Sequence, residues 1–218
     1  MLSIVIENYL KSIFHLTQNE NNRITTTELA KYMNVKSASI TDMMQRLEGM
    51  DLVDYKKYQG VILTNLGRKR AIDLVRKHRL WEVFLVEKLQ FTWSEVHIVA
   101  EQLEHIHSDK LIDKLENFLG NPKWDPHGDP IPDKEGTMET REQFPLAELL
   151  KGESATILGV SLDDENFLKF LEESELTIGK KILVNTAFSF DDSVQILANN
   201  QLINLSKKVA QHILVRKD

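Results

Sequence analysis

The chain has 218 residues, of which 42% are hydrophobic, and this predicts one or two domains with a sizeable core. No apolar run is long enough to cross a bilayer, so we expect no membrane association. The absence of cysteine excludes disulfides and thiolate metal sites, and it fits a cytoplasmic protein. Glu7 and Asn8 stand where a signal peptide would need an apolar core.

The charge is distributed unevenly along the chain. The net charge of −6 argues against a wholly basic nucleic-acid-binding protein. Residues 1–90, however, carry fourteen basic and ten acidic side chains, whereas residues 91–218 carry thirteen basic and twenty-three acidic ones. This asymmetry indicates that only the first part of the chain meets a polyanion.

The first fifty residues have the pattern of three helices. Residues 3–17 carry the apolar stripe of an amphipathic helix. Thr25 and Glu28 have the spacing of a capping box, which predicts the start of a short second helix. Asn34 suits the tight turn that follows, and a third helix is expected over residues 38–50.

The third helix has an apolar side and a small, polar side, and Ser37 is expected to be its N-cap. Two short helices joined by a tight turn are typical of a helix-turn-helix, in which the second helix enters the major groove. The polar side is therefore the candidate DNA-reading surface. We expect phosphate contacts from Lys36, Ser39 and Thr41 and base contacts from Ala38, Asp42 and Gln45, with Ser37 beside them.

A two-stranded wing is expected after this helix. Residues 52–56 and 61–64 are strand-like, and the turn between them carries Lys57, which could reach the DNA backbone. A helix, a helix-turn-helix and such a hairpin together predict a winged helix. The alternative is a winged helix that contacts protein in place of DNA.

The next segment combines basic residues with ligands suited to a metal. Thr64 is expected to cap a helix over residues 65–88, on which His78 and Glu82 stand four residues apart on one face. Its basic residues are expected near DNA or in solvent. They are Arg68, Lys69, Arg70, Arg76, Lys77 and Arg79.

A second set of ligands follows at helical spacing. His97, Glu101, Glu104 and His105 stand at i, i+4, i+7 and i+8, within an arc of roughly 100° on one helix. A divalent cation would gather such side chains, and an all-nitrogen and oxygen set suits Mn(II), Fe(II) or Zn(II). The alternative is a face that is only solvated.

The rest of the chain divides into a linker and a β-rich end. All five prolines lie in residues 122–145, so a linker is expected there, and Asp125 and His127 within it are possible further ligands. Short strands around one helix over residues 165–174 predict a small SH3-like β-barrel.

The apolar helix over residues 108–119 is a candidate dimer interface. The predicted boundaries are 1–64 for the winged helix, 65–120 for the metal-binding and dimerisation helices, 121–145 for the linker and 146–218 for the barrel.

With these elements in this order, the chain resembles the diphtheria-toxin-repressor family of metal-dependent regulators, which includes the manganese regulators. The most specific matches are the segments KHRLWE and VHIVAEQLEH, and FPLAELLKGESATILGV resembles the domain of ferrous-iron transport accessory proteins. The resemblance implies a mainly α fold with a β-barrel. It also implies a homodimer that binds a palindromic operator when loaded with Mn(II) or Fe(II), and that is not an enzyme.

The resemblance also implies two metal sites in each subunit. One would take His78, Glu82, His97 and a residue of the last domain, with Asp163 or Asn166 as the best match. The other would take Glu101, Glu104, His105 and Asn8, and long manganese-type relatives add the ligands matched by Asp125 and His127. This chain departs from the family at Asn8, where relatives have Asp or Met, and at Lys11, where manganese-type relatives often have Glu.

Two other functions remain open from the sequence. The first is a ferritin-like di-metal oxidoreductase, which also uses Glu-x-x-His on bundle helices, but a second complete helix of that kind is missing. The second is a winged-helix regulator that senses no metal. Metal-dependent operator binding separates the favoured function from the second alternative, and oxygen consumption with bound iron separates it from the first.

Overall fold

The computed structural model describes residues 2–17 and 23–218, and the chain forms two compact units. Unit 1 comprises residues 1–78, 103–107 and 132–137. Unit 2 comprises residues 79–102, 108–131 and 138–218. Among the described helices, none combines the length and the apolar character needed to cross a membrane.

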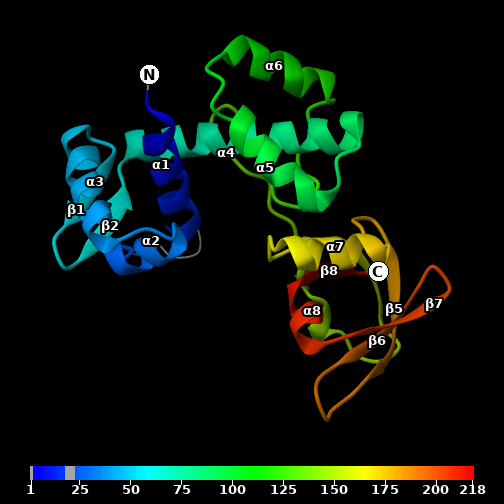
Figure 1. Cartoon of the computed structure of the whole chain (residues 1–218). Coiled ribbons are helices and arrows are strands. Elements are labelled where there is room, and N and C mark those ends of the chain that lie inside the picture. The colour runs from blue at the N-terminus through cyan, green and yellow to red at the C-terminus, as the bar shows by residue number, and fades with distance from the viewer. Residues whose placement is uncertain (1, 18–22) are drawn as a thin grey trace. The chain divides into compact units, whose positions relative to one another are not determined.

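Unit 1 is the predicted winged helix, drawn in blue and cyan in Figure 1. It contains α1 (Ile4–Thr17), α2 (Thr26–Tyr32), α3 (Ser37–Gly49), β1 (Val53–Lys56), β2 (Gly60–Leu63) and the first part of α4 (Asn65–Leu89). Its core is made of fully buried side chains from α1, α2 and α3, among them Phe14, Leu29 and Met44. The apolar stripes of these helices therefore face one another, as their spacing predicts.

The helix starts in this unit mostly follow the sequence signals. Thr25 accepts a hydrogen bond from the backbone N–H of Glu28, whose carboxylate accepts one from the Thr25 N–H, so the capping box is confirmed. Asn34 has a φ of 53°, as expected for its turn. The expected cap of α3 is wrong, because that helix already begins at Ser37 and its N-cap is Lys36, which makes no side-chain capping bond.

The wing is a short antiparallel hairpin in which Val53 pairs with Leu63 and Lys56 with Gly60. Gly60 has a φ of 100°, and a Cβ there would lie 2.3 Å from the carbonyl oxygen of Ile24, so this position requires glycine. Ile24 pairs in turn with Val61. The wing is thereby attached to the segment that precedes α2.

Helix α4 runs unbroken for 25 residues, and its first part belongs to unit 1. Thr64 caps it as expected, because its Oγ1 accepts a hydrogen bond from the N–H of Gly67. Of its basic residues, Arg68, Lys69 and Arg70 are exposed. The other three, Arg76, Lys77 and Arg79, are buried, so the expectation that they could lie in solvent is wrong.

Helix α5 (Trp93–Leu103) is shorter than expected. The chain turns after Leu103, and the N–H of Ile106 donates to the Leu103 carbonyl. Glu104 and His105 therefore do not lie on the same helix face as His97 and Glu101, and that prediction is wrong. Helix α6 (Asp109–Phe118) then begins after Ser108, which caps it.

Unit 2 is built on a six-stranded antiparallel sheet in the order β3-β8-β4-β5-β6-β7, which agrees with the SH3-like expectation (Figure 1). Its elements are β3 (Phe144–Pro145), η1 (Leu146–Glu148), β4 (Ser154–Val160), α7 (Glu165–Glu173), β5 (Lys181–Ala187), β6 (Val194–Ala198), β7 (Gln201–Leu205), α8 (Lys207–His212) and β8 (Ile213–Lys217). Register shifts at Ile157/Gly159 and Val184/Thr186 are bulges, which bend a sheet.

One core joins the sheet of unit 2 to its helices. Side chains of β4, β6 and β8 pack with Leu168 of α7 and with Trp93, the first residue of α5. The backbone N–H of Trp93 also donates to the Glu172 carboxylate at 2.6 Å. Helix α5 is thus fixed against the sheet domain, and this positions the histidine and glutamates that α5 carries.

Candidate metal centre and nucleic-acid interface

Unit 2 brings together six of the predicted ligands, which we call the Asp125 cluster. They are Glu82, His97, Glu101, Asp125, His127 and Asp163. They come from α4, α5, the proline-rich segment and the loop before α7. One ligand atom from each of Glu82, Asp125 and His127 lies within 4.8 Å of the other two, and all three residues are buried.

His97 connects three carboxylates of this cluster. Its Nδ1 lies 3.5 Å from Glu82 Oε1 and 3.3 Å from Asp163 Oδ2, and its Nε2 lies 3.4 Å from Glu101 Oε1. The contacts with Glu101 and Glu82 raise the pKa of His97 to about 10, although partial burial opposes this. An imidazolium therefore balances the carboxylates at neutral pH.

Asp125 is held by a turn of the proline-rich segment. Its Oδ1 accepts hydrogen bonds from the backbone N–H groups of His127 and Asp129, each at 2.9 Å. Its Oδ2 lies 3.5 Å from Nε of Arg79. Burial raises the pKa of Asp125 to about 7, with further contributions from the charges of Glu82 and Asp129, while Arg79 opposes the shift. The turn fixes the carboxylate in a place that disfavours its charge.

The donor set of the Asp125 cluster fits a divalent cation. The Nε2 atom of His127 is buried and has no hydrogen-bond partner among the residues that the structure describes. Buried polar atoms are nearly always paired, so such a nitrogen beside two buried carboxylates indicates a ligand that a metal would complete. The oxygens and imidazole nitrogens suit Mn(II), Fe(II) or Zn(II).

Arg79 and Asp129 lie beside this cluster, and the sequence did not predict a role for either of them there. Arg79 donates to the Pro130 carbonyl at 2.5 Å, and its Nη2 lies 3.3 Å from Asp129 Oδ2. The sequence shows Arg79 only as one of several basic residues on a helix. Asn166, in contrast, is exposed in the first turn of α7, and the contacts of the described residues do not connect it to the cluster.

Unit 1 holds a second group, which we call the Lys11 cluster. It consists of Glu7, Lys11, His78, Glu104 and His105. Lys11 Nζ lies 2.7 Å from Glu104 Oε2 and 3.2 Å from His78 Nδ1. His78 Nδ1 is also 2.5 Å from Glu104 Oε2. An ammonium group therefore lies beside two of the predicted ligands, which also contact each other.

The first helix supplies Glu7 to this cluster. Glu7 Oε2 lies 2.6 Å from His105 Nδ1, whereas Asn8, the residue that the resemblance indicated, is exposed. The sequence could have revealed Glu7, because it stands four residues before Lys11 on the same side of α1.

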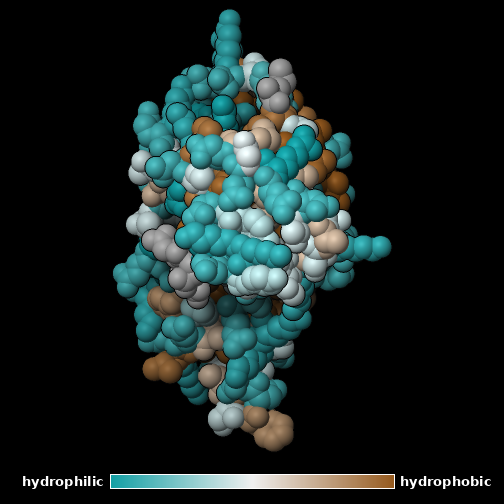
Figure 2. All heavy atoms as spheres, turned by 90° about the vertical axis from the view of Figure 1, so that its left-hand side faces the viewer, coloured by the Kyte–Doolittle hydropathy of each residue, from teal (hydrophilic) through white to brown (hydrophobic). Residues whose placement is uncertain are grey.

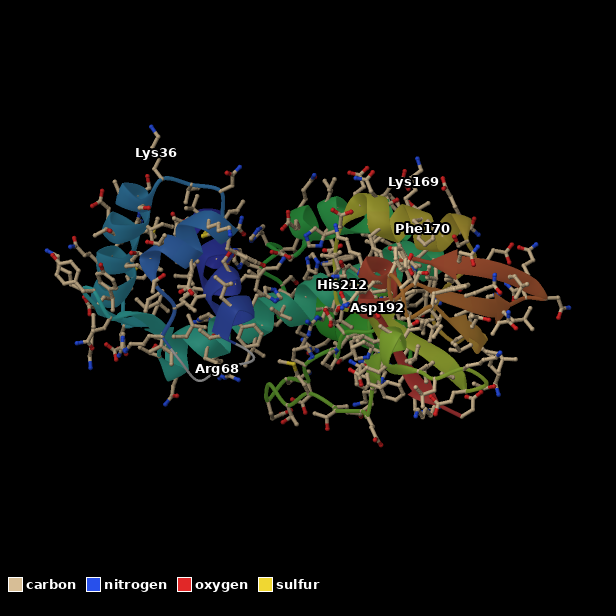
Figure 3. All side chains as sticks on the ribbon, turned by 90° about the horizontal axis from the view of Figure 1, so that it is seen from below. Lys36, Arg68, Lys169, Phe170, Asp192 and His212 are labelled. Carbon is tan, nitrogen blue, oxygen red and sulfur yellow. The ribbon has the colours of Figure 1, made fainter. Side chains whose placement is uncertain are left out.

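The candidate DNA-reading surface lies on α3 and the wing. Lys36, Ser37, Ala38, Ser39, Asp42, Gln45 and Lys57 are exposed, and Thr41 is half-buried. Figure 3 shows Lys36 pointing away from the ribbon at the start of α3. In the wing, Lys57 Nζ lies 5.2 Å from the centre of the Tyr58 ring, which is 92% exposed. The face turned to the viewer in Figure 2 is mainly hydrophilic.

Comparison with protein families accounts for nearly the whole chain. Residues 1–61 match the iron-dependent repressor N-terminal DNA-binding domain, residues 64–133 match the iron-dependent repressor metal-binding and dimerisation domain, and residues 144–217 match the FeoA domain. These three matches follow the order of the elements in the structure.

Individual relatives agree with the family models. The chain is 36% identical to an uncharacterised HTH-type transcriptional regulator of Methanocaldococcus jannaschii, over 54% of this chain and 94% of that protein. It is 25% identical to the iron-dependent repressor IdeR of Mycobacterium leprae, over 97% and 96% of the two chains.

Solved structures show the same relationship over the full length. A manganese-dependent transcriptional repressor in complex with manganese superposes with a TM-score of 0.84 at 30% identity, covering 98% of this chain and all of the other. The structure of ScaR with bound Cd²⁺ gives 0.78 at 36% identity, covering 98% and 99%. The chain belongs to the diphtheria-toxin-repressor family of iron- and manganese-dependent transcriptional repressors.

Proposed function

We propose that the protein is a cytoplasmic homodimeric repressor that binds a palindromic operator when Mn(II) or Fe(II) occupies the Asp125 cluster, and that it controls metal-uptake genes. The observation that carries the metal dependence is the buried triad of Glu82, Asp125 and His127, in which the His127 Nε2 has no partner among the described residues. Burying two carboxylates is costly, and a cation offsets that cost.

In the loaded state, five residues of the cluster are assigned distinct roles. Glu82, Asp125 and His127 form the buried part of the site, and His97 and Asp163 close it from the more exposed side. A bound cation would supply the positive charge that the imidazolium of His97 otherwise provides. His97 would have to lose its proton to act as a ligand, so ion binding would release protons.

Arg79 and the turn at Asp125 position the buried ligands in this proposal. The two backbone N–H groups orient one carboxylate oxygen, and the guanidinium lies beside the other. Such outer contacts fix ligand orientation in metal sites. A fixed Asp125 favours an ion that accepts oxygen ligands, and the whole set contains no sulfur.

The α3 helix is proposed to read the operator while the wing contacts its backbone. Lys36, Ser39, Thr41 and Lys57 are assigned to phosphates, and Ala38, Asp42 and Gln45 to base edges, with Ser37 beside them. Exposed apolar side chains on α5 and α6 support a dimer interface. They are Ile98, Leu111 and Phe118. A dimer presents two reading helices, which explains why the operator is expected to be palindromic.

Selection of DNA from a random duplex pool tests this function. The metal-free protein is incubated with the pool in Mn(II) or in EDTA, and the bound duplexes are sequenced. We expect a palindromic site to be enriched with Mn(II) and not in EDTA. Enrichment of the same site in both conditions would contradict the metal dependence. No enrichment in either condition would contradict the proposal that the protein is a sequence-specific DNA-binding regulator. The family membership supports neither the oxidoreductase nor the metal-independent regulator.

A further inference from the structure

We propose that the Lys11 ammonium acts as a built-in cation in the Lys11 cluster, so that a metal ion enters this second site only by displacing it. The inference deepens the proposed function and rests on it, because the Lys11 cluster is a second group of predicted ligands. It joins Glu104 and His105 of one expected site with His78 of the other. It follows from where the Lys11 side chain ends and from what surrounds it.

The ammonium uses the atoms that a metal ion would need. Lys11 Nζ lies 2.7 Å from Glu104 Oε2 and 3.2 Å from His78 Nδ1. A transition-metal ion would have to approach this oxygen and this nitrogen to about 2.0–2.2 Å. On the side that the ammonium occupies, an ion bound to both atoms would overlap it, and on any other side the ammonium would repel the ion at short range. The seated lysine therefore opposes metal binding at these two atoms.

Burial makes this ammonium important to the cluster. Glu104 is only 1% exposed and Lys11 only 9% exposed. A buried carboxylate needs a positive partner, and Lys11 supplies a full charge in direct contact. The side chain reaches the cluster from α1, whose buried face also includes Leu10 and Ile13. The packing of α1 therefore holds the Lys11 ammonium beside Glu104.

A second contact shows that α1 meets this cluster on one helix face. Glu7 stands one turn before Lys11 and lies 2.6 Å from His105 through Oε2. Lys11 thus contacts the carboxylate of Glu104, and Glu7 contacts the imidazole of His105, both in the 103–107 segment. This pairing joins α1 to the segment through side chains of unit 1 alone, and it requires no ion.

Two consequences follow for metal binding. In the Asp125 cluster, the buried His127 Nε2 has no hydrogen-bond partner among the described residues and is open to an ion, so this cluster should fill first. The Lys11 cluster should fill later. Its apparent affinity for the ion is proportional to the fraction of molecules in which the ammonium does not contact Glu104, and that fraction is small when most molecules have it in place. If the ammonium contacts Glu104 in about 99% of the molecules, the apparent affinity falls about a hundredfold.

Manganese titration of the metal-free full chain tests the proposal. Free aquo-Mn(II) is counted by electron paramagnetic resonance, and the bound ions are fitted to two sites. The variants are Lys11→Ala, which removes the ammonium, and Lys11→Met, which keeps an apolar stem for packing. Lys77→Met is the matched control, because Lys77 is also buried and pairs with Asp73 at 2.7 Å.

We expect the parent to bind one ion tightly and a second at least about thirtyfold more weakly. Lys11→Ala and Lys11→Met should raise the affinity for the second Mn(II) ion at least about tenfold, and Lys77→Met should leave that affinity unchanged. Adding Glu104→Gln to Lys11→Ala should remove the gain, which assigns it to this cluster. Circular dichroism of each metal-free variant checks the fold.

Three results separate failure of this inference from failure of the proposed function. The built-in cation is overturned if the first Mn(II) binds tightly but both Lys11 variants bind the second Mn(II) no more tightly than the parent does. If the parent binds two ions with similar affinity, it is overturned as well. If the parent shows no tight event at all, the metal-dependent function itself fails.

Discussion

The Asp125 carboxylate lies 3.5 Å from Nε of Arg79, and the two side chains are 2% and 5% exposed. Arg79 belongs to α4, whereas Asp125 belongs to the proline-rich segment, so this pair joins two distant parts of the sequence. The same guanidinium donates to the Pro130 carbonyl. A basic residue of a helix thus organises a candidate metal centre.

Replacing Arg79 with Met should therefore destabilise the metal-free protein. The change leaves Asp125 without its positive neighbour, and breaking a buried pair costs about 3–5 kcal/mol of unfolding free energy. Urea denaturation in EDTA measures the loss. Arg70→Met, an exposed change on the same helix, is the control and should cost less than about 0.5 kcal/mol. A loss below about 1 kcal/mol for Arg79→Met would show that the pair contributes little.

Manganese affinity should rise with pH. The pKa of Asp125 is raised to about 7 and that of His97 to about 10. Both groups hold a proton at pH 6 that the ion must displace, whereas above about pH 7 only His97 does. We expect affinity to rise up to about a hundredfold per pH unit below pH 7 and about tenfold per unit from 7.5 to 8.5.

Calorimetry in buffers of different ionisation enthalpy counts the released protons directly. More than one proton per tightly bound ion is expected at pH 6.5 and about one at pH 8.5. An affinity that does not change between pH 6 and 8, with no proton released, would mean that neither group is a ligand.

Removing the basic group of the wing should weaken DNA binding without regard to sequence. Lys57 is exposed beside Tyr58, and a phosphate contact there adds affinity through counterion release. Lys57→Ala should reduce the slope of log K against log salt by roughly one unit, on operator and on unrelated duplex alike. Lys208→Ala, an exposed change in α8, is the control. An unchanged slope for Lys57→Ala would place this side chain away from DNA.

The metals should differ in how well they activate. Zn(II) should bind more tightly than Mn(II) or Fe(II) by the Irving–Williams order, yet it favours four ligands in a tetrahedron. It can therefore be held by part of the Asp125 cluster and leave other ligands unengaged. We expect Mn(II) and Fe(II) to give full operator binding and Zn(II) to give less at saturation. Equal operator affinity with all three saturating ions would contradict this difference.

The sequence predicts local structure well where a short pattern decides it. The capping box of Thr25 and Glu28 is such a case, because both hydrogen bonds lie within one helical turn. The cap at Thr64 and the hairpin strands are further examples. The order of the elements and the SH3-like domain followed from hydrophobic periodicity and from the family resemblance.

Only part of the grouping of the ligands could be predicted, because Glu82, His97 and Asp163 lie together as the resemblance implied, whereas the position of Glu104 and His105 was wrong. Helical spacing placed Glu104 and His105 on the face of His97, but α5 ends at Leu103 and the chain turns. A tertiary contact, and no local signal, likewise decides that Arg79 faces Asp125. Lys11 was visible as a departure from the family, but only the fold shows that its ammonium meets Glu104.

Fluorescence anisotropy of a labelled duplex, carrying the palindrome selected with Mn(II), tests the metal dependence most directly. The parent and His127→Ala are each titrated onto this duplex in EDTA and in saturating Mn(II). We expect Mn(II) to tighten binding by the parent at least about a hundredfold and to have less than about a tenth of that effect on His127→Ala, with both proteins equally folded. Equal affinity of the parent in EDTA and in Mn(II), or full activation of His127→Ala, would contradict metal-dependent DNA binding through the Asp125 cluster.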